Sequence, residues 1–224
     1  MIRRVEVPLL GALLAVLVVG AALEIALLPP VTRALATAVG SERYTGLSRE
    51  RTLELAEGVR AYVAGTSSAQ LPAEVDGRAG FDAAQVSHLD DVRAVIVRAH
   101  VATAALLLAV GTWLAAAIRR GRRQEVRRVL TFAGTLLLAG AGVVVLLGVF
   151  DFERLFTAFH GLFFKAGTWQ FAAEDLVIQV FPEAFWASAG ALWGGLCVLG
   201  GLLLLFLGRR SRELREVAAR HNGE

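Results

Sequence analysis

Cysteine is nearly absent from this chain, and so are several motifs that commonly mark an enzyme. Among the 224 residues Cys197 is the sole cysteine, so no internal disulfide can staple the loops. The sequence also lacks internal repeats, a P-loop, a dinucleotide-binding fingerprint, a serine nucleophile elbow and a cysteine–histidine cluster at metal-ligand spacing. None of these common routes to function is therefore indicated by a motif.

Charge is also scarce in four long apolar runs, which account for a mean hydropathy of +0.59. The runs cover 8–28, 101–118, 130–150 and 184–207, and Glu24 is the only charged residue within them. Each is near the roughly 20 residues that a helix needs to cross a hydrocarbon core of about 30 Å. Because a helix satisfies its own backbone groups where water is absent, we predict an all-α membrane protein, a single polytopic domain with four transmembrane helices.

The basic residues predict the orientation of these helices. The N-terminal start, the 119–128 loop and the tail from Arg209 hold 13 of the 23 basic residues. Short basic loops stay in the cytoplasm, so we expect a protein of the cytoplasmic membrane whose two termini lie in the cytoplasm. Segments 29–100 and 151–183 would then lie outside. The pI of about 9.7 then reflects topology and not nucleic-acid binding. A cleaved signal peptide is the alternative for residues 1–28, whose apolar stretch is longer than the usual length of about 7–15 residues.

The two outer segments predict an extracytoplasmic cap of short helices. Pro29 and Pro30 should end the first span and turn the chain. The apolar spacing within 48–64 predicts an amphipathic helix, and the Gly-, Ser- and Pro-containing stretch 65–80 predicts a loop. A further helix is expected to start near Asp82 and to continue into the second span.

Residues 150–164 form an aromatic segment that is too polar at its start to span a bilayer. Its phenylalanines recur at helical spacing: Phe152, Phe156, Phe159, Phe163 and Phe164. This pattern predicts a short helix lying along the membrane surface, where aromatic rings are favoured, and Trp169 and Trp186 suit the same depth. Plain anchoring by aromatic rings would produce the same pattern.

Three histidines on the outer side are candidate catalytic bases. His160 lies inside the aromatic segment, where desolvation would lower its pKa and keep the imidazole neutral. His88 lies three residues before Asp91, which can face it on a helix and fix its tautomer. His100 lies twelve residues after His88, about 120° away on a continuous helix, so the two cannot share one site unless the helix breaks. Structural roles remain open for all three.

These residues form a pattern that resembles a known family. It comprises Phe150-Asp-Phe, Phe156, Phe159-His160, Phe163-Phe164, Trp169, Phe181-Pro-Glu183 and Phe185, preceded by His88-x-x-Asp91-Val92. The pattern, together with four spans and a large first outer loop, resembles the bacterial integral membrane family that includes the lipoprotein intramolecular transacylase. The resemblance covers most of the chain, and Trp186 stands where a second phenylalanine is expected.

The resemblance implies an acyltransferase that needs no cofactor and no metal. Its partners would be membrane lipid and the N-terminus of a lipoprotein whose cysteine carries a diacylglyceryl group. The sn-2 acyl chain would move to the α-amino group of that cysteine, giving a lyso-form lipoprotein. His160 and His88 would be the catalytic pair, and the supporting residues would be Asp91, Arg93, Arg154, Trp169 and Glu183. Of these, Asp91 would orient His88, and Arg93 or Arg154 would hold the oxyanion or the lipid headgroup region.

Two other classes of protein fit the same residues. One is a non-enzymatic membrane assembly or scaffold protein whose outer histidines are structural. The other is a metal- or haem-binding bundle that uses His88, His100 and His160, although no fourth ligand is evident. An enzyme requires His88 and His160 within hydrogen-bond reach of a shared lateral cleft that is open to lipid, whereas a scaffold has no such requirement.

Overall fold

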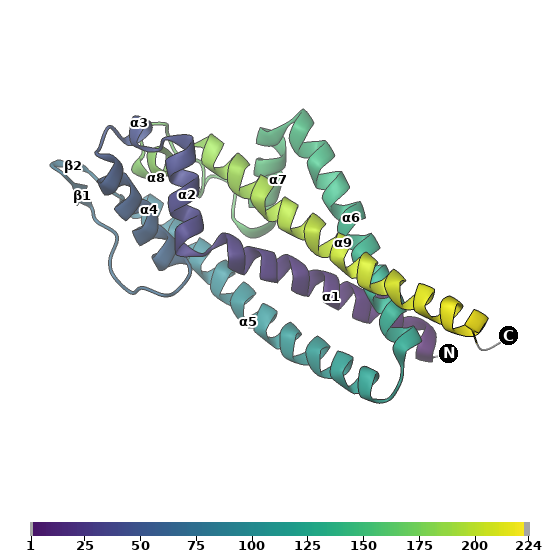
Figure 1. Cartoon of the computed structure of the whole chain (residues 1–224). Helices are drawn as coiled ribbons and strands as arrows, with labels where there is room; N and C mark the ends of the chain where they lie inside the picture. The colour runs from purple at the N-terminus through teal and green to yellow at the C-terminus, as the bar shows by residue number, and fades with distance from the viewer. Residues whose placement is uncertain (1, 222–224) are drawn as a thin grey trace. The chain divides into compact units, whose positions relative to one another are not determined.

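The computed structural model describes residues 2–221, and their regular structure is almost entirely helical (Figure 1). The helices are α1 (Ile2–Ala26), α2 (Pro29–Val39), α3 (Glu42–Thr45), α4 (Arg49–Val63), α5 (Ala83–Arg119), α6 (Arg123–Phe150), α7 (Phe152–Phe163), α8 (Leu176–Val180) and α9 (Glu183–His221). A small antiparallel hairpin, β1 (Glu74–Val75) and β2 (Arg78–Ala79), lies between α4 and α5 along the chain.

Four of the helices, α1, α5, α6 and α9, are long and apolar enough to cross a membrane, by length and composition. Within the 37 residues of α5, the stretch 101–118 carries no charged residue, whereas 83–100 carries two aspartates and two arginines. Only the second half of α5 therefore suits a hydrocarbon core of about 30 Å. The predicted fold class, an all-α membrane protein with four such helices, is confirmed.

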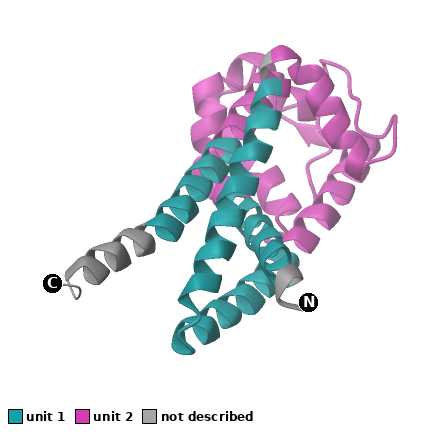
Figure 2. Ribbon diagram, turned by 90° about the vertical axis from the view of Figure 1, so that its right-hand side faces the viewer, with its two compact units in different colours: residues 1–22, 101–146, 193–224 teal, residues 23–100, 147–192 magenta. Residues whose placement is uncertain are grey.

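The chain divides into two compact units (Figure 2). Unit 1 contains Met1–Ala22, Val101–Leu146 and Trp193–Glu224. Its buried residues are mostly aliphatic and come from all four long helices; they are Leu14, Ala15, Val110, Val129, Ala133, Leu137 and Leu204. The indole N–H of Trp193 on α9 donates to the carbonyl of Val19 on α1 at 3.0 Å, which links these two helices within unit 1.

Unit 2 contains Leu23–His100 and Leu147–Leu192, and it includes both segments expected outside the membrane. Its apolar core draws on α4, the first half of α5 and α8, with Leu53, Val59, Leu89 and Val180 among the buried residues. Segments far apart in the sequence are thus held in one core. Every residue of the candidate site described below belongs to this unit.

Local sequence explains where α2 and α4 of unit 2 begin, and one further element, the hairpin, was not predicted. Ser48 caps α4 by accepting the backbone N–H of Arg51 at 3.2 Å, so the predicted helix within 48–64 is α4. Pro29 and Pro30 follow the end of α1, but they begin α2 instead of a loop, since proline is well tolerated in the first turn of a helix. The hairpin lies inside the stretch 65–80, which was predicted as loop throughout.

Candidate active site

His160 on α7 and His88 on α5 lie beside each other in unit 2. Their ring centroids are 6.3 Å apart, and the two rings are inclined at 31°. The residues are 72 positions apart in the sequence, so the pairing comes from the packing of α7 near the start of α5. The two predicted histidines are therefore neighbours in unit 2.

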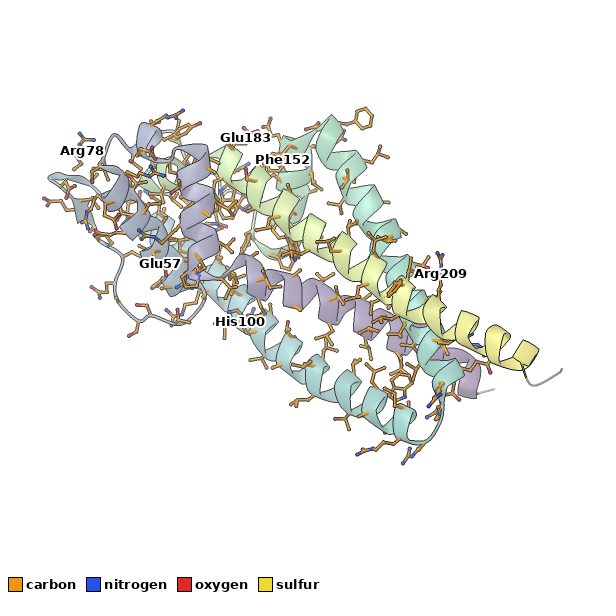
Figure 3. All side chains as sticks on the ribbon, in the orientation of Figure 1. Glu57, Arg78, His100, Phe152, Glu183 and Arg209 are labelled. Carbon is orange, nitrogen blue, oxygen red and sulfur yellow. The ribbon has the colours of Figure 1, made fainter. Side chains whose placement is uncertain are left out.

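Helix α7 is the predicted aromatic helix, and it presents His160. Asp151 caps it by accepting the backbone N–H of Arg154 at 2.9 Å. None of the residues of α7 is fully buried, and Leu162 is 78% exposed. Phe152, which begins the helix, is labelled in Figure 3. An apolar helix with exposed side chains is typical of a segment that lies in a membrane interface.

The tautomer of His160 follows from its hydrogen bond. Its Nδ1 lies 2.9 Å from the backbone carbonyl oxygen of Phe156, one turn earlier in α7. Because a carbonyl oxygen can only accept, Nδ1 must carry the hydrogen, and Nε2 keeps a lone pair. The rings of Phe156 and Trp169 flank the imidazole, with centroids 4.0 Å and 4.6 Å away. Burial lowers the pKa of His160, partly opposed by the bond to Phe156, so the ring is a neutral base at pH 7.

His88 is more deeply enclosed than His160. It is 8% exposed, and the rings of Phe164 and Phe171 lie 5.0 Å and 5.6 Å from its own. Burial, and to a smaller degree the neighbouring His160, lower the pKa of His88 to about 4, although the charge of Asp91 acts to raise it. Its Nδ1 is buried and has no hydrogen-bond partner among the groups that the structure describes. The imidazole is thus neutral and has hydrogen-bonding capacity to spare.

The five supporting residues occupy different surroundings. Trp169 lies against His160, as described above. Asp91 is exposed, and among the described residues it makes no hydrogen bond to His88, although its charge acts on that ring. Arg93 donates from Nη1 to the carbonyl of Ser67 at 3.0 Å and lies over the Tyr62 ring.

Arg154 and Glu183 complete the predicted set, and both are exposed. Arg154 lies on α7, the helix that carries His160. Glu183 is the first residue of α9 and is labelled in Figure 3. Trp169 is therefore a supporting residue that contacts one of the two imidazoles directly, by its ring contact with His160.

Gln85 and Phe171 belong to the same neighbourhood, although the sequence did not single them out. Gln85 lies three residues before His88 on α5 and is 2% exposed. Its Oε1 accepts the backbone N–H of Val177 at 3.1 Å, and its Nε2 donates to Asp175 at 3.4 Å. Gln85 thus ties the start of α8 to α5, next to the segment that brings Phe171 to His88. The feature of the sequence that could have identified Gln85 is its position, a polar side chain one helical turn before His88.

His100 makes a separate pair. Its Nδ1 lies 2.7 Å from Oε1 of Glu24, the charged residue of the first apolar run. In the part of the chain that the structure describes, His100 has no ring contact with His88 or His160. Among the side chains that the structure describes there is also no group of three or more His, Cys, Asp or Glu that could hold a metal ion.

Comparison with known proteins identifies the family of this chain. A sequence model of the family described as lipoprotein intramolecular transacylase Lit matches residues 9–186, a range that includes His88 and His160. The in meso structure of the membrane integral lipoprotein intramolecular transacylase Lit from Bacillus cereus is similar, with a TM-score of 0.69 at 18% identity over 91% of this chain and 97% of that chain. A variant of that protein with a histidine-to-arginine mutation gives a TM-score of 0.67 at 14% identity, covering 94% of this chain and 93% of that one.

An uncharacterized protein of Aquifex aeolicus (strain VF5) is also similar, with 28% identity over 94 residues. This match covers 36% of the present chain and spans less than half, 44%, of the length of that relative. At these identities the solved structures show a common fold. Since the family match extends over most of the sequence, the chain belongs to the lipoprotein intramolecular transacylase Lit family.

Proposed function

We propose that this chain moves the sn-2 acyl chain of a diacylglyceryl lipoprotein to the α-amino group of the lipoprotein's own N-terminal cysteine. The observation that carries the proposal is the pair of neutral imidazoles at 6.3 Å, one of which has a defined tautomer. Family membership supports the class of reaction, and the geometry of the histidines supports the way in which protons move.

In this proposal His160 is the general base. The substrate's α-ammonium, with a pKa near 8, first loses one proton to water. The free amine then attacks the sn-2 ester carbonyl carbon as its N–H proton passes to Nε2 of His160. The C–N bond forms, the ester C–O bond breaks, and the same proton is returned to the departing glycerol oxygen. The products are an amide and a free hydroxyl group, so no cofactor and no redox partner enters the balance.

His88 is proposed to stabilise the charge that develops on the carbonyl oxygen. A neutral imidazole can donate one N–H to an oxyanion, and a pKa of about 4 keeps His88 neutral throughout the physiological range. The surrounding aromatic rings exclude water, which strengthens such a bond and protects the ester from hydrolysis. Among the supporting residues, Asp91 acts on His88 through its charge, and exposed Arg154 is our candidate for contact with the lipid headgroup.

The site is proposed to work at the outer face of the cytoplasmic membrane, with both termini in the cytoplasm. The unequal distribution of basic residues supports this orientation. The exposed apolar side chains of α7, such as Leu162 and Phe163, support a position at the depth of the glycerol esters. The acyl chains can then remain in the bilayer while the ester reaches His160.

The test is mass spectrometry of a reporter lipoprotein's N-terminal peptide, made in a host that lacks N-acylation. Wild-type protein should give N-acylated, lyso-form product, and His160→Asn should lower the rate by about 10²- to 10⁴-fold, the usual contribution of a general base. His221→Asn in the C-terminal tail is the matched control. Membrane levels and detergent melting of the His160→Asn protein should match those of wild type, because the substitution removes the general base and leaves the fold intact.

Two outcomes would contradict the proposal. If His160→Asn stays active while His100→Asn loses activity, the general base is His100 and not His160. Failure of the wild type to yield N-acylated product with any reporter would mean that the chain does not carry out this reaction.

A further inference from the structure

A cavity that carries a few polar groups lies in unit 2, at the turn that follows α1. It is a cavity of about 460 Å³ with mostly apolar walls. Leu27, Leu28, Pro29 and Ala64 provide apolar surface, and Glu24, Arg60, Thr66 and His100 provide polar groups. None of these residues belongs to the aromatic surroundings of His88 and His160, so the proposed transfer reaction leaves this cavity without a role.

The cavity holds a carboxylate in an otherwise apolar run. An ionisable side chain in an apolar membrane-spanning run is costly and therefore indicates a functional site. Glu24 accepts from Nδ1 of His100 at 2.7 Å, yet its side chain remains 41% exposed. With Nδ1 used as the donor, Nε2 of a neutral His100 is an acceptor. The pair therefore offers hydrogen-bond acceptors and a negative charge.

Arg60 provides a fixed positive charge on the wall of the same cavity. Its side chain is 11% exposed, and its Nε donates to Glu57 at 2.9 Å. Its Nη1 donates to the carbonyl of Leu27 at 3.3 Å, a group left without a helical partner just after the end of α1. Figure 3 labels Glu57 and His100, from α4 and α5. Charges of both signs thus border one apolar cavity.

We propose that this cavity binds the headgroup of a phospholipid that carries a primary ammonium, of the phosphatidylethanolamine type. The ammonium would donate its N–H groups to Glu24 and His100, and the phosphate would face Arg60. A quaternary ammonium has no N–H to donate, and an anionic headgroup without an amine would meet the carboxylates of Glu24 and Glu57. The acyl chains would lie along exposed apolar side chains of unit 2 such as Leu28, which lines the cavity.

The experiment is native mass spectrometry of the full-length, detergent-purified protein with three lipids of identical acyl chains. These are phosphatidylethanolamine, phosphatidylcholine and phosphatidylglycerol. We expect the ethanolamine lipid to bind about three- to fivefold more tightly than the choline lipid, because both carry the same charges but only the primary ammonium adds an N–H hydrogen bond to the partly exposed carboxylate. Glu24→Gln should abolish this preference, whereas Glu24→Asp should retain part of it. The matched control is Glu50→Gln, an exposed carboxylate paired with Arg33 at 3.1 Å, which should leave the preference intact.

Equal binding of the three lipids would overturn the proposal, as would an unchanged preference in Glu24→Gln protein that melts like wild type. Tighter binding of phosphatidylglycerol would also overturn it, because the phosphate alone would then be recognised. The His160→Asn protein should show the wild-type preference. Lipid binding and acyl transfer can therefore succeed or fail independently.

Discussion

Replacing Gln85 by leucine tests whether the start of α8 holds the histidine pair in its aromatic surroundings. Leucine has a similar size, so the change removes two hydrogen bonds without opening a large cavity. The N–H of Val177, in the first turn of α8, then loses its acceptor, while the residue itself is buried. The bond to Asp175 is long at 3.4 Å, and its loss should matter less.

The cost follows from the unpaired N–H group. A buried donor without a partner destabilises a protein by about 1–3 kcal/mol. For a chain of this length that corresponds to a fall in melting temperature of roughly 3–9 °C. Part of this loss should be local, because Phe171 lies in the segment just before α8 and contacts His88. Loosening that segment would admit water to His88.

The effect on activity has a definite sign with pH. Burial is the main cause of the low pKa of His88, so exposure should raise that pKa from about 4 toward its ordinary value of 6.5. A larger fraction of His88 would then be protonated at pH 6 than at pH 8. We therefore expect Gln85→Leu to lose more transfer rate at pH 6 than at pH 8, relative to wild type.

The assay measures N-acylated product at both pH values, together with melting in detergent. Gln70→Leu, at an exposed glutamine of the loop between α4 and β1, is the matched control and should resemble wild type in both measurements. If Gln85→Leu melts like wild type, Gln85 does not hold the start of α8 against α5. An equal fractional loss of rate at pH 6 and pH 8 would show that Gln85 contributes to stability without shielding His88.

Three further predictions concern stability and topology. Because His88 stays neutral in the folded protein, acidification from pH 6.5 to 4 should protonate this histidine first in the unfolded chain and lower the free energy of unfolding by up to about 3 kcal/mol. Thermal melts of His88→Asn should lack this part of the acid sensitivity. Ser48→Ala removes the cap of α4 and should cost about 1 kcal/mol in denaturant unfolding. In a Cys197→Ser background, an impermeant thiol reagent should label Ser68→Cys on intact cells and leave Arg120→Cys unlabelled; the opposite result would reverse the proposed orientation.

Local pattern determined much of this protein from the sequence alone. The four apolar runs predicted the long helices, because length and hydropathy are properties of continuous segments. The spacing of phenylalanines predicted the helix that became α7, and the amphipathic pattern predicted α4. His88 and His160 could be named as a pair from the family resemblance, although their separation of 6.3 Å could not.

Only the tertiary structure decided which distant residues meet. Glu24 and His100 are 76 residues apart, and Gln85 lies 92 residues before Val177, so no helical or strand period relates them. Their hydrogen bonds depend on the path of the whole chain through unit 2. The ring of Trp169 meets that of His160 in the same way, since Trp169 comes from outside α7. Sequence periodicity sets which face a residue occupies, and packing sets which partner it finds there.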